Sequence, residues 1–219
     1  MKKIMSLVVM IAFCSTLLLL GCSGANSIKL NKKYFLSNIE FMGFSGNRSS
    51  VQKYLDSQDS VEEINVFSDY FDLALRARFS FGTQTSGTLT IPQMVAAFNT
   101  NNAELNNKID DAREAGIINA SGDLIINFDY NQNKNKITIG KVHTQILSTG
   151  DLDFAEAITE LVSYMSGDSS KNNVRITNQT ANVFEIKNGK IEITLQLEYR
   201  RNSDSENPDM ATTLKLKLA

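Results

Sequence analysis

A cysteine at position 22 is the residue whose surroundings indicate a definite chemistry. It follows a run without charged side chains, residues 4–20, which itself follows two lysines, and a small residue, Gly21, precedes it. A basic start, a short apolar stretch and a small residue before the cleavage site are typical of a signal peptide, and the stretch is shorter than the roughly 20 residues of a membrane span. The sequence therefore predicts export, with residues 1–21 removed and Cys22 as the first residue of the mature chain.

The tetrapeptide Leu19-Leu20-Gly21-Cys22 resembles the lipobox of bacterial lipoproteins, and this resemblance covers residues 1–22 only. In that family the cysteine thiol receives a diacylglycerol, the chain is cut before the cysteine, and the new N-terminus is usually acylated, for example with palmitate. The resemblance thus implies lipidation of Cys22 and cleavage between Gly21 and Cys22. Each buried methylene contributes about 0.8 kcal/mol, so two or three acyl chains hold a protein firmly on a membrane.

The residues around the cysteine also bear on where the protein is held. Leu20 is less usual at its position than a small or β-branched residue, and an ordinary secretory signal that happens to end in Gly-Cys is the alternative interpretation. In the lipoprotein family an aspartate after the cysteine usually retains the protein in the inner membrane, and Ser23 stands there instead. The resemblance therefore implies a lipid-anchored protein of the bacterial cell envelope, on the outer membrane if the bacterium has two membranes.

His143 is the only histidine, so any histidine chemistry would depend on it alone. A multi-histidine metal site is excluded, and a Ser-His-Asp arrangement would need neighbours such as Ser148 and Asp151. No Gly-x-Ser-x-Gly sequence accompanies these residues. We therefore expect His143 to be an ordinary strand residue.

Residues 129–135 carry Asp or Asn at every second position, which is the ligand spacing of a calcium loop. Lys134 and Gly140 stand where such a loop needs a turn glycine and a bidentate glutamate, so we expect a polar hairpin loop and no metal. The alternation of apolar residues changes phase at Gly140, which predicts a β-bulge at that glycine.

Other candidate acid–base or phosphate-binding residues have simpler explanations. Asp110 and Asp111 are adjacent and would point apart on a helix, and Asp151 or Asp153 is suited to cap a helix. The glycines of residues 82–87 lack the lysine of a phosphate-binding loop. The sequence thus predicts no enzymatic activity and no cofactor.

Charge and cysteine content exclude further classes of protein. Cleavage removes two lysines, so the net charge changes from −2 to −4, and this mild acidity provides no basic surface for nucleic acid. Cys14 leaves with the signal peptide and Cys22 would carry lipid, so the mature chain has no disulfide. Its 198 residues are enough for one domain with a sizeable core.

The pattern of apolar residues predicts an α+β domain, a mostly antiparallel sheet of about six strands with two main helices packed on one face. Residues 1–21 are the signal peptide, 22–27 the lipidated N-terminus and short tether, and 28–219 a single domain. Residues 28–68 give no clear pattern. Alternation predicts strands at 71–81, 124–130, 137–146, 184–187, 190–199 and 214–218. Helical spacing predicts one imperfect helix or two over 92–116, and another that is capped by Asp151 or Asp153 and reaches Met165.

Asn188-Gly189 is the strongest local signal in the domain, because a type I′ turn needs positive φ at both central residues. The predicted hairpin places Ile186 opposite Ile191 and Phe184 opposite Ile193. Its register is therefore specified by the turn itself.

Two non-enzymatic functions are favoured at this stage, and an enzymatic activity that no motif reveals is the third alternative. The first is binding of a protein partner in a membrane-associated assembly, which predicts a filled core and an exposed apolar patch, with residues 28–44 the favoured place. The second is a carrier or sensor of a lipid or another hydrophobic ligand, which predicts an apolar cavity of roughly 300 Å³ or more. Residues 88–146 are similar in pattern to tubular lipid-binding lipoproteins, with Thr90-Ile91-Pro92-Gln93-Met94 preceding a long hairpin, and this resemblance implies no particular binding residues.

Overall fold

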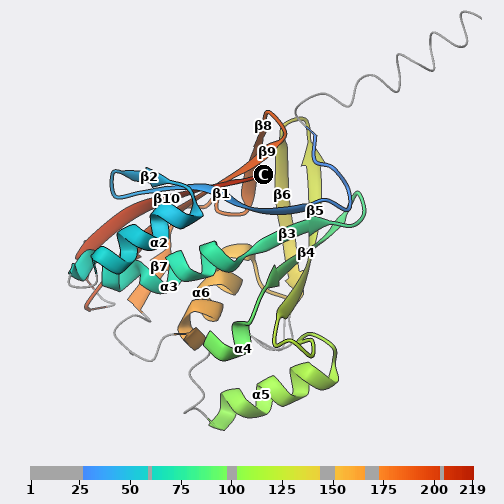
Figure 1. Cartoon of the computed structure of the whole chain (residues 1–219), viewed down its shortest axis with the longest axis horizontal. Coiled ribbons are helices and arrows are strands. Elements are labelled where there is room, and N and C mark those ends of the chain that lie inside the picture. Colours follow the sequence, from blue (N-terminus) through green and yellow to red (C-terminus); the bar gives the residue numbers. More distant parts are fainter. Residues whose placement is uncertain (1–26, 59–60, 98–102, 144–150, 166–172, 203–204) are drawn as a thin grey trace, which may run out of the picture.

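The computed structural model describes residues 27–58, 61–97, 103–143, 151–165, 173–202 and 205–219. These residues form a closed barrel of eight antiparallel strands, in which each wall strand pairs with the next one along the chain (Figure 1). The last strand pairs with the first and closes the wall. The wall strands are β1 (Lys33–Phe41), β3 (Arg78–Phe81), β4 (Ser86–Ile91), β5 (Leu124–Asn133), β6 (Lys136–His143), β8 (Val183–Lys187), β9 (Lys190–Tyr199) and β10 (Met210–Leu218).

Long insertions and tight turns lie at opposite ends of the barrel. Because consecutive wall strands alternate in direction, the segments after β1, β4 and β6 leave the wall at one end, which we call the helix end. The turns after β3, β5 and β8 lie at the other end, the turn end, with the start of β1 and the end of β10 (Figure 1). The insertions are β2 (Phe44–Gly46), α2 (Arg48–Ser57), α3 (Glu62–Arg76), α4 (Met94–Ala97), α5 (Ala103–Glu114), α6 (Phe154–Met165) and β7 (Val174–Ile176).

Side chains fill the interior of the barrel. Helices α3 and α6 contribute buried residues to the interior, where they meet the inward faces of the wall strands. The apolar cavity between them holds only about 30 Å³, roughly the volume of one water molecule. The Tyr70 hydroxyl donates a hydrogen bond to the Val174 carbonyl (3.2 Å) and ties α3 to β7, and burial raises the pKa of Tyr70 to about 12.

The predicted fold class is wrong. Instead of a mostly antiparallel sheet of about six strands with two main helices on one face, the described residues form a closed wall of eight strands with two extra strands, β2 and β7. The prediction missed β1 and β4. A register shift between Leu36 and Asn38 puts a bulge in β1 and changes the phase of its apolar residues. In β4, Gly87 faces inward and interrupts the apolar face.

The predicted strand at residues 71–81 is also mostly wrong, because residues up to Arg76 belong to α3 and only 78–81 form a strand. Ile64, Phe67, Phe71 and Ala74 are all buried at helical spacing, and this longer stripe determines the conformation. The alternation within 71–77 arises because both sides of the last helical turns are buried.

Two local predictions are confirmed. Asn188 and Gly189 have φ angles of 53° and 73°, and Ile186 pairs with Ile191 across the hairpin. Phe184 belongs to the β8–β6 pairing, opposite Ile137, and the β8–β9 register does not reach it.

The predicted bulge at Gly140 is present as well. Phe128 pairs with Val142 and Tyr130 with Ile139, so two residues of β6, Gly140 and Lys141, lie opposite the single residue Asp129.

Candidate partner-binding groove

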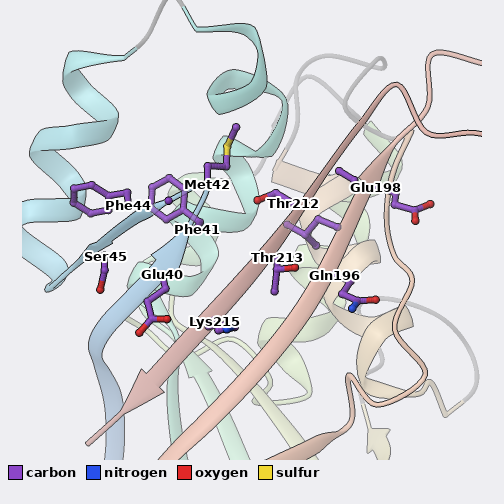
Figure 2. A pocket seen from close by; sticks show the side chains of 13 residues that line it. Glu40, Phe41, Met42, Phe44, Ser45, Gln196, Glu198, Thr212, Thr213 and Lys215 are labelled. Carbon is purple, nitrogen blue, oxygen red and sulfur yellow. The ribbon is translucent and has the colours of Figure 1, made fainter.

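The barrel wall opens between β1 and β10 near the helix end. The pairing of these strands ends at Glu40 and Lys215, whereas β10 continues to Met210 in contact with β9 only. A groove of about 730 Å³ occupies this opening (Figure 2). Its lining comes from the end of β1, the turn after it, the start of β2 and the parts of β9 and β10 nearest the helix end. The lining residues are Glu40, Phe41, Met42, Gly43, Phe44, Ser45, Gln196, Leu197, Glu198, Ala211, Thr212, Thr213 and Lys215.

The backbone of β10 turns unpaired groups toward this groove. In a regular strand, alternate residues direct their N–H and C=O groups to opposite edges. The Ala219 N–H donates to the Phe35 carbonyl of β1, and the Lys217 carbonyl accepts from the Ser37 hydroxyl, so odd-numbered residues of β10 face the β1 side. Ala211 and Thr213 therefore direct their N–H and C=O groups into the groove, where no backbone of the described residues pairs with them.

An aromatic cluster holds the hairpin of β1 and β2 away from β10. The ring of Phe41 lies 4.3 Å from that of Phe71 on α3, and Phe44 stacks on Tyr54 of α2 at 4.4 Å between centroids. Phe41 is almost fully buried. Because these rings dock the hairpin on α2 and α3, the opening beside β10 is part of the packed structure.

The turn of this hairpin carries a strained and exposed methionine. Met42 and Gly43 have φ angles of 46° and 78°, the type I′ pattern that Asn and Gly adopt most readily. A residue with a Cβ in this region costs about 1–2 kcal/mol, and the Met42 side chain is 40 % exposed at the groove. Strain of this kind clusters at functional sites.

Two carboxylates at the groove, Glu40 and Glu198, form ion pairs with cations outside its lining. Glu40 binds Lys217, whose ammonium lowers the pKa of that carboxyl by hydrogen bonding, and Glu198 binds Arg200 at 3.0 Å. Lys215 lies on the exposed face of β10, and within the described part of the chain no carboxylate forms an ion pair with it. The charge of Lys215 acts on Glu40, whose pKa it helps to lower, so the groove holds one cation that makes no ion pair with a described carboxylate and that lies within electrostatic reach of Glu40.

The residues predicted to carry the lipid and the cleavage site, Cys22 and Gly21, lie outside the described residues, as does Ser148. The structure does describe His143, which is exposed between two carboxylates: Nδ1 lies 3.0 Å from Asp151 Oδ1, and Nε2 lies 3.2 Å from Asp129 Oδ2. The hydrogen bond with Asp151 is the main reason that the pKa of His143 is raised. Both ring nitrogens therefore lie within reach of a carboxylate, and the two carboxylates stabilise the protonated ring.

The other candidate residues take structural roles. Asp153 caps α6, accepting from the Glu156 N–H at 2.8 Å while the Glu156 carboxylate accepts from the Asp153 N–H at 3.0 Å. Asp110 pairs with Arg113 at 3.1 Å. Among the described residues, no group of three or more His, Cys, Asp or Glu side chains could hold a metal ion, and the calcium-like stretch 129–135 is a tight hairpin. Within the same residues, no helix is long and apolar enough to cross a membrane.

The groove was not predicted from the sequence. The predicted last strand began at Leu214 and so left out residues 210–213, which form the open edge. The available signal was the pair of β-branched residues Thr212 and Thr213. The favoured apolar range, 28–44, does contain the exposed large apolar residues Leu30, Phe35 and Met42, although the first and last lie at opposite ends of β1.

No protein family model, curated protein or solved structure matches the chain, and its function is therefore inferred from this geometry.

Proposed function

We propose that the protein is a lipid-anchored component of the bacterial envelope, held by Cys22, that binds a protein partner in the groove beside β10 and catalyses no reaction. The observation that carries this proposal is the contrast between a filled interior and an open wall. The interior cavity of about 30 Å³ has no room for a ligand, whereas the groove of about 730 Å³ exposes backbone groups and the side chain of Lys215.

The position of the groove suits a tethered binder. The described chain enters at Ser27 at the turn end, and the five residue steps back to Cys22 span at most about 17 Å. The groove lies beyond β1, a strand of nine residues and thus about 30 Å long. A lipid on Cys22 would therefore hold the turn end near the membrane and present the groove away from it. Ser23 favours the outer membrane if the bacterium has two membranes.

The alternative, a carrier or sensor of a hydrophobic ligand, has less support. Pockets for ligands of drug size usually have volumes of about 300–1,000 Å³ and are mostly apolar. The apolar cavity in the barrel is about a tenth of the lower limit, and α3 and α6 would have to move before a lipid could enter.

Site-specific photo-crosslinking in living cells tests the proposed function. A photoreactive amino acid replaces Met42 at the groove in the full-length chain, and in the matched control it replaces exposed Asn127 on β5, across the barrel. We expect one protein adduct from position 42 and none of the same mass from position 127. A lipid adduct, or no adduct, at position 42 would contradict partner binding.

The anchor is tested separately by labelling cells with radioactive palmitate. Wild-type protein should carry the label, and Cys22→Ala should not. Equal labelling of the two would exclude lipidation at this cysteine.

A further inference from the structure

We propose that the partner enters the groove as an extended strand that pairs antiparallel with Met210–Leu214 of β10 and carries an acidic residue opposite Thr213. This inference rests on the proposed function and specifies what the partner must look like.

The register of the wall defines the vacant position. Glu40 pairs with Lys215, so a straight continuation of β1 would place residue 42 opposite Thr213 and residue 44 opposite Ala211. The chain turns back at Met42 instead, and Phe41 pairs with Phe44 within the hairpin. The position beside Met210–Leu214 of β10, where a neighbouring strand would pair, is therefore empty over five residues, about 17 Å.

Backbone chemistry selects a polypeptide as the occupant. The N–H and C=O groups of Ala211 and Thr213 present two donors and two acceptors that repeat at every second residue. An extended peptide supplies the complementary groups at the same repeat, as in other proteins that bind peptides at a sheet edge. An acyl chain offers neither donors nor acceptors along its length.

The positive charge of Lys215 favours an acidic side chain on the partner strand. Odd-numbered residues of β10 point outward, so the partner residue opposite Thr213 would also point outward and lie diagonally next to Lys215. An Asp or Glu at that place would meet the cation that lacks an ion-pair partner among the described residues. Like-charged Lys or Arg there would be repelled.

The shape of the groove favours a slender segment over a second folded copy. The hairpin of β1 and β2 borders the groove along one side (Figure 2). A second barrel that offered its own β10 would bring its own hairpin into the same space. A single extended segment fits between the hairpin and β10 without such a conflict.

A crosslinking register experiment tests the geometry. Photoreactive residues are placed singly at Ala211 and Thr213 of the full-length chain, and the crosslinked positions in the partner are located by mass spectrometry. Antiparallel pairing predicts that position 213 reaches a partner residue j near an Asp or Glu, and position 211 reaches residue j+2. Adducts to a second copy of this chain, adducts to lipid, unrelated positions or no adducts would overturn strand addition.

A proline variant provides the second test. Thr213→Pro removes one N–H at the groove edge and leaves the β9 side of the strand intact, whereas Thr213→Val keeps the N–H and the branched shape. We expect about a tenfold loss of the crosslink from position 42 in the proline variant and less than twofold in the valine variant, with thermal unfolding of both followed as a check on folding. If the proline variant fails to fold, hydrogen exchange decides: the Thr213 amide of wild-type protein should gain protection when the crosslinked segment is added as a synthetic peptide.

The two proposals fail in different ways. Retention of the protein adduct at position 42 without the 211/213 register would overturn strand addition and leave partner binding in place. Loss of the adduct at position 42 would overturn both.

Discussion

At the scale of single residues, His143 belongs to a network of charged side chains on the surface. Its two carboxylate neighbours come from different segments, Asp129 from β5 opposite the bulge in β6 and Asp151 from the residues before α6. Lys141 also binds Asp151, at 2.8 Å, so the group is a surface ion-pair network. Such networks stabilise the charged form of histidine and contribute little stability in water.

The titration of His143 is the first prediction. Its pKa in the folded protein is raised above the usual value near 6.5, so its stabilising contribution is fully present below about pH 6.5 and is lost as the pH rises through the folded-state pKa. Proton NMR gives the midpoint directly, because the chain has one histidine. We expect a midpoint above 6.5 in wild-type protein and a lower one in Asp151→Asn. A wild-type midpoint at or below 6.5 would contradict the described contacts.

The turn residues of the β8–β9 hairpin give the second prediction. Gly189 has a φ of 73°, where an added Cβ costs about 1–2 kcal/mol, so Gly189→Ala should lower the free energy of unfolding by that amount. Asn188→Gly is the matched control, because glycine accepts the φ of 53° at that position, and it should change stability by less than about 0.5 kcal/mol. Urea denaturation measures both, and equal effects of the two variants would show that the turn is not type I′.

At the scale of elements, the helix caps and hairpin turns are specified locally, whereas the boundary between α3 and β3 is not. Residues 71–81 alternate like a strand, yet the stripe that begins at Ile64 makes residues 62–76 helical. The chain leaves the helix at Ala77, whose extended conformation (φ −56°, ψ 136°) starts the path into β3. Where a helical and a strand-like spacing of apolar residues overlap, the longer of the two patterns therefore decides the conformation.

The capping box of α6 gives the third prediction. Asp153→Ala removes the acceptor for the Glu156 N–H and should lower the free energy of unfolding by about 1 kcal/mol. Glu156→Gln keeps an oxygen that can accept from the Asp153 N–H, so it should cost about 0.5 kcal/mol or less. Thermal or urea unfolding distinguishes the two. If Asp153→Ala were as stable as wild-type protein, the cap would not contribute to folding.

At the scale of the whole molecule, closure of the barrel separates two ends with different surroundings. The tight turns and the entry of the chain share one end, and the helical insertions share the other (Figure 1). If Cys22 carries a lipid as proposed, this polarity would give the barrel a defined orientation on the membrane. It also places the open edge of β10 where a partner could reach it.

Energy transfer in vesicles gives the fourth prediction. The lipidated chain is labelled at a single introduced cysteine, Asn133→Cys at the turn end or Glu114→Cys at the end of α5, and the vesicles contain an acceptor lipid. Both positions are exposed, and β5, about 30 Å long, separates the two ends. Transfer should be stronger from position 133. Equal or reversed transfer would contradict the orientation.

The sequence by itself determined the features whose causes lie within a few residues: the type I′ turn at Asn188-Gly189, the bulge at Gly140, a helix cap at Asp151 or Asp153 and most of the later strands. It also supplied the lipobox resemblance, which the described residues do not test. Only the tertiary structure decided that the sheet closes, because closure depends on pairing β1 with β10, residues about 180 positions apart with no local signal for each other. The groove follows from the same cause. It exists where that long-range pairing stops at Glu40 and Lys215, and the point at which it stops is set by the aromatic packing of Phe41 and Phe44 on two helices.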